Sequence, residues 1–155
     1  MAKACPQLPD IARLTAAMPA LQGVIAARWR EAHACNEAGC PVAAVILLGS
    51  VLEGLLLSRA LLSRAEASAS AHAPKDKNGK TVAVADWKLA ALIAVAHERG
   101  WVRGGMAGWS RVLRRYRNAV HPGAEAAAAM AFTAARVRGC HKSLRVIAGD
   151  LVASC

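Results

Sequence analysis

Apolar residues recur three or four positions apart along most of this chain, which is the spacing that lines one face of an α-helix. The first clear stretch runs from Leu21 to about Ala38 and is followed by Gly39 and Pro41. Glycine favours the end of a helix, and proline favours the first turn of the next one. The pattern therefore predicts a helix that ends at Gly39 and a second helix that begins at Pro41.

The second helix, over about residues 41–65, is apolar on nearly all sides, with Ser50 and Glu53 as exceptions on one face. A helix without a polar face belongs in the middle of a bundle. Gly49 and Gly54 would let neighbouring helices approach it closely. Its uncharged run stops at Glu53, well short of the ~20 apolar residues that a membrane-spanning helix needs. We therefore expect a buried central helix and no membrane partner.

The rest of the chain alternates between helical patterns and breaks. Alanine and leucine dominate and only 4% of residues are aromatic, which favours helices over strands. The sequence predicts a single all-α domain over residues 1–155, built as a bundle of five to six helices. Before the two helices above, we expect a polar lead over residues 1–9 and a short helix capped by Asp10. After them, we expect an exposed loop over residues 66–83 and a helix from Asp86 to Gly100. A link with the sequence GWVRGGMAG then leads to a helix around Trp109–Val120, and a last helix runs from about Glu125 to Val152.

The last expected helix carries an apolar stripe whose members are three or four residues apart. A stripe of this kind faces a core or a partner helix. His141 lies within it, and we interpret it as a core histidine rather than a ligand. The stripe consists of Met130, Ala134, Val137, His141, Leu144, Ala148 and Leu151.

The chain is strongly basic, with a formal net charge of +10 and a pI of about 10.2. A basic balance suits a polyanionic partner such as RNA, although codon bias in a GC-rich genome also raises the arginine content. Lys75, Lys77 and Lys80 in the expected loop are open to both interpretations, because they would either be solvated or help to hold an RNA backbone. RNA is the partner that the charge favours.

Five cysteines are present, an odd number without any CxxC pair, which is a poor disulfide framework and a poor zinc signature. We expect free or buried thiols in a reducing cytoplasm, with no metal and no cofactor. The N-terminus lacks the long apolar run of a signal peptide. The alternative, a metal site, would require the following residues to meet: His33, Cys35, Cys40, Cys140 and His141.

One stretch, RRYRNAVHPG, gathers basic groups within a few residues and begins at Arg114. On a helical wheel, with about 100° per residue, Arg114, Arg117, Asn118 and His121 share one flank beside the apolar stripe. Arg115 falls on the far side. A flank beside the core is where a cleft edge or a subunit interface lies. The following proline places His121 near a helix C-terminus, where the dipole favours the imidazolium form.

These groups suit the cleavage of a phosphodiester without a metal. A histidine such as His121 moves protons near neutral pH, and an arginine holds a phosphate with two hydrogen bonds. Asn118 would orient the histidine or bind a phosphate oxygen, and RNA supplies its own nucleophile, the 2′-OH. One histidine per chain is meagre for two proton transfers, so two chains meeting at this face would form a more complete site. Solvated arginines and a histidine that merely caps the helix remain the alternative.

The segment LRRYRNAVHP, residues 113–122, resembles the signature of HEPN domains, the higher-eukaryote and prokaryote nucleotide-binding family. That signature is an arginine followed by four to six residues and a histidine, often with an asparagine before the histidine. Both Arg114 and Arg115 fit the count, and the wheel favours Arg114. Residues 43–57 and the segment DWKLAALIAVAHERG are also similar to small bacterial HEPN-like proteins.

The resemblance implies a helical bundle, a homodimer and, in active members, a metal-independent endoribonuclease. Such members often act as toxins in toxin–antitoxin systems or as antiphage defence effectors, so an antitoxin or a defence-system protein is an implied partner. Other members are non-catalytic modules that bind RNA, a nucleotide or a protein, and this is the alternative function. In some toxins a tyrosine two residues after the histidine is modified by the antitoxin. Gly123 stands there in this chain, so the resemblance does not support that mode of control.

The resemblance also suggests roles for individual residues. His121 would be the general acid or base, and Arg114 the main ligand of the phosphate and of the transition state. Arg117 and Asn118 would position the substrate. Glu53 needs a partner because it stands in a nearly apolar helix, and Arg114 or Arg117 is the natural candidate. Glu53 would then orient the site from behind, unless it pairs with another arginine or lies near the helix surface.

Overall fold

The computed structural model of this protein describes residues 4–118, 121–123, 126 and 132–155. Of the helix over residues 104–117, it describes the backbone throughout and the side chains except those at positions 106, 107 and 109. Helices make up the secondary structure of these residues, apart from an isolated bridge between Lys75 and Thr81. The predicted all-α bundle is confirmed.

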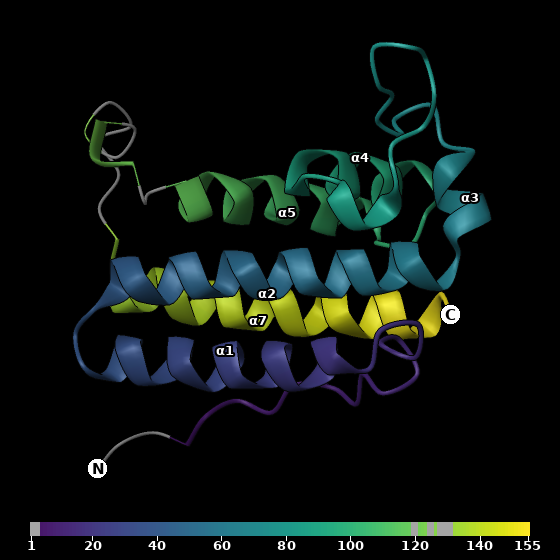
Figure 1. The fold of residues 1–155 in the computed structure, drawn as a ribbon. Coiled ribbons are helices and arrows are strands. Elements are labelled where there is room, and N and C mark those ends of the chain that lie inside the picture. The colour runs from purple at the N-terminus through teal and green to yellow at the C-terminus, as the bar shows by residue number, and fades with distance from the viewer. Residues whose placement is uncertain (1–3, 119–120, 124–125, 127–131) are drawn as a thin grey trace.

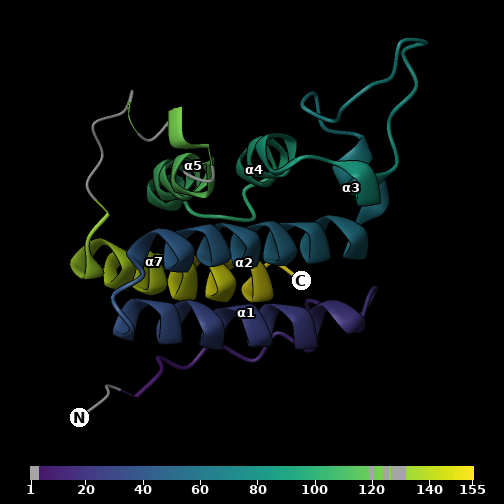
Figure 2. The same ribbon diagram turned by 60° about the vertical axis from the view of Figure 1, so that its left-hand side comes forward.

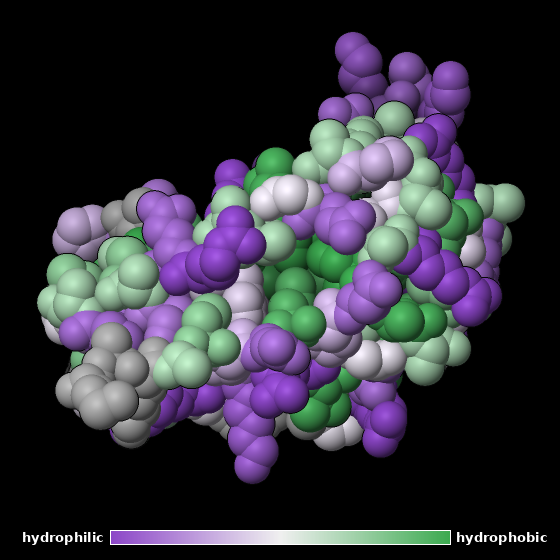
Figure 3. Space-filling model, turned by 90° about the horizontal axis from the view of Figure 1, so that it is seen from below, coloured by the Kyte–Doolittle hydropathy of each residue, from purple (hydrophilic) through white to green (hydrophobic). Residues whose placement is uncertain are grey.

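The central helix is α2 (Pro41–Leu62), and the other long helices surround it. Along one side of it runs α1 (Ala20–Glu37), and on the opposite side lie α4 (Leu89–Glu98) and α5 (Gly104–Arg117) (Figures 1 and 2). The last helix, α7 (Ala134–Ala153), packs against α1, α2 and α5. Seen from the side of α1, the surface is mostly hydrophilic but exposes apolar residues in a hollow near its middle (Figure 3).

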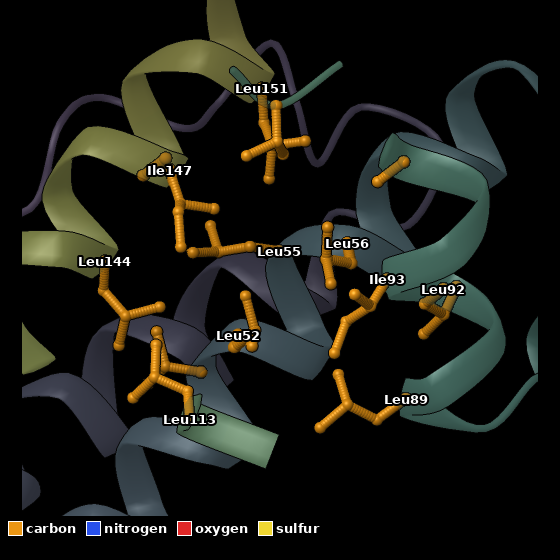
Figure 4. Close-up of a cluster of buried hydrophobic side chains, with 14 of the residues drawn as sticks. Leu52, Leu55, Leu56, Leu89, Leu92, Ile93, Leu113, Leu144, Ile147 and Leu151 are labelled. Atoms are coloured by element: carbon orange, nitrogen blue, oxygen red, sulfur yellow. The ribbon is translucent and has the colours of Figure 1, made fainter. Parts of the chain in front are cut away.

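Leucine side chains of α2 form the middle of the core, as its all-round apolar pattern predicts. Leu52, Leu55 and Leu56 are fully buried and meet apolar side chains from α4, α5 and α7 (Figure 4). Burying one such side chain stabilises a fold by about 1.5–3 kcal/mol. The hydrophobic effect therefore fixes α2 at the centre, and it positions α5, which carries the basic stretch, against α2.

By length and composition, α2 also meets the criteria for a membrane-spanning helix, and no other helix in the described part of the chain does. Its apolar window is 56% buried inside the protein. A central helix of a bundle has the same composition, because every side of it faces other helices. The neighbours of α2 thus account for its hydropathy.

The ends of several helices follow from local sequence signals. Gly39 and Gly100 adopt φ values of +76° and +68°, a left-handed conformation that ends a helix and that glycine adopts at low cost. Pro41 occupies the first turn of α2, where its missing N–H costs nothing. These three predicted boundaries are confirmed.

Two helix starts predicted from aspartates are wrong. The Asp10 carboxylate accepts a hydrogen bond from the Ala12 N–H at 2.9 Å, but residues 12–17 form turns instead of a helix. A single short turn is too small to offset the cost of helix nucleation. Asp86 ends a 3-10 turn, η1 (Val84–Asp86), and α4 begins only at Leu89. Trp87 explains the delay, because its backbone is extended and its indole N–H donates to the Val82 carbonyl.

The expected exposed loop over residues 66–83 is only partly a loop. The first residues of the expected loop belong to a short helix, α3 (Arg64–Ser68). Helix α2 ends at Leu62 rather than near residue 65. Ala67, Ser70 and Ala73 are buried. The prediction failed there because small polar and alanine residues pack against the bundle as easily as they face water. The loop residues that are exposed as predicted are Lys75, Lys77 and Lys80.

The last two helices begin at other places than predicted. The helix that carries the basic stretch starts at Gly104, inside the segment expected to be a link. The final helix does not run on from Glu125, because Thr133 caps α7 by accepting a hydrogen bond from the Arg136 N–H. Of its predicted stripe, Met130 lies outside the described residues and Ala134 is exposed. The stripe residues that are buried as predicted are Val137, His141, Leu144, Ala148 and Leu151.

His141 is buried among helices α1 and α7, which confirms its interpretation as a core histidine. The residue is 3% exposed, and its ring meets the Trp29 ring edge to face, with the centroids 4.4 Å apart. Desolvation by burial, helped by the nearby charge of His33, lowers the pKa of His141 to about 4. The imidazole is therefore neutral at physiological pH in the folded chain.

This burial predicts that the folded state loses stability in acid. Between pH 6.5 and 4 the unfolded chain binds a proton at His141 that the folded chain does not, so the free energy of unfolding falls as the pH falls through this window. The loss amounts to about 3 kcal/mol below pH 4. Urea denaturation at several pH values measures it, with His141→Phe as the control that lacks the titrating group. Equal pH dependence in the two proteins would contradict the assignment.

Candidate functional site

Helix α5 places the basic stretch at the surface because its other side belongs to the core. Leu113 is fully buried, and Tyr116 is half-buried with its ring 5.4 Å from that of Phe132. Arg114 and Arg115 are exposed. Leu113 and Tyr116 thus anchor the helix, while the side chain of Trp109 and the whole of Val120 lie outside the described residues.

The helix ends before it reaches the histidine. Arg117 is its last residue, and Asn118 caps it with a backbone N–H directed at the carbonyl groups of Arg114 and Tyr116. The prediction that one wheel extends to His121 is therefore wrong. The physical reason is the proline at position 122, which disfavours helical backbone in the residue before it.

His121 nevertheless stays close to the end of the helix. It forms a bend, its side chain is exposed, and its backbone N–H donates to the Asn118 carbonyl at 3.0 Å. Arg114 and Arg117 are one turn apart and both exposed. Together with Arg115, three guanidinium groups lie in the last turn of α5, and one imidazole lies in the bend after it. Asn118 is half-buried between them in the chain.

Glu53 pairs with Arg117, one of its two predicted partners. The Arg117 Nη2 lies 3.3 Å from the Glu53 Oε2, and the two side chains are 45% and 32% exposed. An ion pair that water reaches this easily adds at most about 1 kcal/mol of stability. Its effect is geometric, because it holds the Arg117 guanidinium against α2. Arg114 has no such carboxylate partner among the described residues.

A pocket of about 310 Å³ surrounds this ion pair, between α1, α2 and the end of α5. Ser50 and Glu53 both line it, which confirms that they share one face of α2. Arg28 lines it as well and donates a hydrogen bond to the Ser50 hydroxyl. Arg28 was not predicted as part of the site, because nothing in the sequence relates its position on α1 to Ser50.

Gly49 lets α5 approach α2 closely enough for these contacts. A Cβ atom placed on Gly49 would lie 2.3 Å from the Arg117 Cβ and 3.3 Å from its Cα. Such a clash involves the backbone of α5, so a side chain at this position would push the two helices apart. The predicted close approach at Gly49 is thus confirmed, and Arg117 is the residue that approaches.

Substituting Gly49 should therefore destabilise the fold. We expect Gly49→Ala to lower the free energy of unfolding by about 1–3 kcal/mol, because the overpacking outweighs the gain in helix propensity. Gly23→Ala is the matched control, since Gly23 also lies within a helix and a Cβ there would meet nothing within 4 Å. Urea denaturation compares the two. A Gly49→Ala protein as stable as the unsubstituted one would contradict the close packing.

The metal-binding alternative finds no support in the described part of the chain. No three His, Cys, Asp or Glu side chains there are close enough together to hold a metal ion. His33 and His141 lie near each other, with ring centroids 6.2 Å apart, and the five cysteines are unpaired. Burial raises the pKa of the Cys140 thiol to about 11, so it is protonated at neutral pH.

Comparisons with protein-family models, with curated proteins and with solved structures gave no match to this chain.

Proposed function

We propose that this protein cleaves RNA without a metal ion, using the last turn of α5 and the bend that follows it. The observation that carries the proposal is that Arg114, Arg117 and His121 are all exposed and follow one another closely at the end of α5, in a chain with a net charge of +10. Exposed cations attract the phosphates of RNA, and an exposed imidazole can exchange protons with a substrate.

In the proposed reaction His121 serves as general base or general acid. A base removes the proton of the 2′-OH, the 2′-oxygen forms a bond to phosphorus, and the bond from phosphorus to the 5′-oxygen breaks. An acid gives a proton to that leaving oxygen. Arg114 stabilises the charge that develops on the phosphate oxygens. Each of the two proton transfers needs an acid–base group, and the end of α5 offers one histidine per chain. The proposal therefore includes a homodimer in which the two helix ends face each other.

Arg117 and Asn118 position the substrate in this proposal, and Glu53 acts through Arg117. The ion pair to Glu53 fixes the direction of the Arg117 guanidinium before RNA binds, which reduces the entropy that binding costs. The activity requires no cofactor. A cytoplasmic toxin or antiphage defence effector, with an antitoxin or another defence protein as its partner, is the biological setting that this activity suits.

The second candidate is a non-catalytic module that binds RNA, a nucleotide or a protein at the same face. The pairing of Arg117 with Glu53 favours it, because a guanidinium held by a carboxylate contributes less charge to a transition state. The apolar residues of the adjoining pocket, among them Leu21, Val24 and Leu57, would suit a protein partner.

RNA incubated with the purified protein in EDTA distinguishes the two functions. We expect cleavage of single-stranded RNA and no cleavage of DNA with the same sequence, because DNA lacks the 2′-OH. The helical content of the protein is checked by circular dichroism. Intact RNA, together with a gel shift that weakens as salt increases, would contradict the ribonuclease and support the binding module.

A further inference from the structure

Two of the five cysteines meet at the turn that joins α1 to α2. Cys35 lies in the last turn of α1, and Cys40 is the residue directly before α2. Both thiols are free, and the proposed ribonuclease uses neither of them. Because this turn contains no residue of α5, its chemistry is independent of the proposed function.

The backbone of the turn holds these two cysteines in a defined geometry. The Cys40 N–H donates to the Cys35 carbonyl at 2.8 Å, and the Gly39 N–H donates to the Asn36 carbonyl at 3.1 Å. These two hydrogen bonds, with Gly39 at a φ of +76°, form a Schellman motif. The positions of Cys35 and Cys40 are therefore fixed relative to each other by the end of the helix.

The hydrogen bond between the two cysteines limits the distance between their Cα atoms. By standard bond lengths, a carbonyl oxygen lies about 2.4 Å from the Cα of its own residue, and an amide nitrogen about 1.5 Å from its own. With 2.8 Å between the Cys40 nitrogen and the Cys35 oxygen, the two Cα atoms are at most about 6.7 Å apart. Disulfides bridge Cα atoms that are about 4.4–6.8 Å apart, so this turn has the dimensions that a disulfide requires.

The two thiols also differ in their access to solvent. Cys40 is exposed, and its Sγ makes only a weak, long hydrogen bond to the Ala38 carbonyl, at 3.8 Å, which does not hinder rotation of the side chain. Cys35 is half-buried. Burial raises the pKa of the Cys35 thiol, and the neighbouring Glu31 and Cys40 raise it further. A dissolved oxidant therefore reaches Cys40 first, and Cys35 is the thiol that stands behind it.

We propose that Cys35 and Cys40 form a modification site at which a peroxide produces a reversible disulfide. The Cys40 thiolate attacks one oxygen of hydrogen peroxide, so that an S–O bond forms, the O–O bond breaks and hydroxide leaves. The Cys35 sulfur then attacks the Cys40 sulfur, so that the S–S bond forms, the S–O bond breaks and a second hydroxide leaves. The two protons of the thiols convert the hydroxides to water, and the peroxide gains the two electrons that the thiols lose.

The disulfide would connect the end of α1 covalently to the beginning of α2. In a reducing compartment the site holds two thiols, and it responds only when peroxide is present. A dithiol reductant restores both thiols by exchange. The remaining cysteine of the core, Cys140, takes no part, because it is fully buried and burial raises its pKa to about 11.

Peptide mass spectrometry of the full chain tests the proposal. Trypsin releases residues 31–59 as one peptide that contains Cys35 and Cys40 and no other cysteine. After treatment with excess hydrogen peroxide and then iodoacetamide, we expect this peptide to have lost two hydrogen atoms and to carry no alkyl group. Prior reduction with a dithiol should restore alkylation at both positions. A peptide still alkylated at both cysteines, or a disulfide from either of them to Cys5 or Cys155, would overturn the proposal.

Serine variants test the order of the two steps. In Cys35→Ser, the sulfenic acid at Cys40 has no neighbouring thiol, so dimedone should label Cys40 at least about tenfold more than in the unsubstituted protein, where the adjacent thiol reacts faster than a dissolved reagent. Cys155→Ser is the matched control and should form the disulfide as the unsubstituted protein does. Circular dichroism checks the helical content of both variants. Equal dimedone labelling of Cys40 with and without the Cys35 thiol would contradict the proposed pair.

Discussion

The His121→Ala protein is expected to cleave RNA about 10²–10⁴-fold more slowly than the unsubstituted protein, which is the range that loss of a general acid or base covers. Its fold should be unaffected, because the imidazole is exposed and the local hydrogen bond at this position comes from the backbone N–H. Initial rates on a labelled RNA in EDTA measure the activity, and thermal unfolding measures the stability.

A second exposed histidine provides the control for this substitution. His97 lies in the last turn of α4, also near the C-terminal end of a helix. His97→Ala removes the same chemical group and should retain the full rate. If His121→Ala kept the full rate, or if both variants lost activity equally, His121 would not be the proton-transfer group.

The Arg114→Ala protein is expected to lose about 10²–10³-fold in cleavage rate, the range seen when one donor to a transition-state oxyanion is removed. Arg114 is exposed one turn before Arg117, and its guanidinium has no carboxylate partner in the described structure. It is thus available to a phosphate. Arg114→Lys should recover only part of the rate, because an ammonium group cannot make the two parallel hydrogen bonds of a guanidinium.

Arg115→Ala is the matched control for the arginine assignment. Arg115 is the next residue, is also exposed, and differs by about 100° in direction around the helix. Its removal lowers the net charge by the same amount, so a purely electrostatic contribution to RNA binding would affect both variants alike. A rate in Arg115→Ala as low as in Arg114→Ala would contradict a specific role for Arg114.

The parts of the fold that were predicted correctly rest on strong local signals. Gly39, Pro41 and Gly100 mark helix ends because their backbones permit few alternatives there. The all-round apolar pattern of α2 leaves no arrangement other than the centre of the bundle. Asp10 and Asp86 failed as helix starts because a cap stabilises a helix that other contacts have already formed. The indole of Trp87 instead fixes extended backbone where a helix was expected.

The prediction of the candidate site was also correct where it rested on local signals and incomplete elsewhere. The need of Glu53 for a cation follows from one carboxylate in an apolar helix, and the structure assigns Arg117 as that cation. The contact of Arg28 with Ser50 and the packing of the His141 ring on Trp29 depend on how α1 packs against α2 and α7. Such contacts join residues far apart in the chain, and no spacing rule within one helix reveals them.

The most direct measurement for the proposed function is the chemical identity of the RNA ends produced in EDTA. Attack by the 2′-OH without a metal leaves a 2′,3′-cyclic phosphate on one fragment and a 5′-hydroxyl on the other. We predict these ends for the unsubstituted protein and intact RNA for His121→Ala over the same time. Intact RNA with both proteins, or fragments that carry 5′-phosphates, would contradict the proposed function.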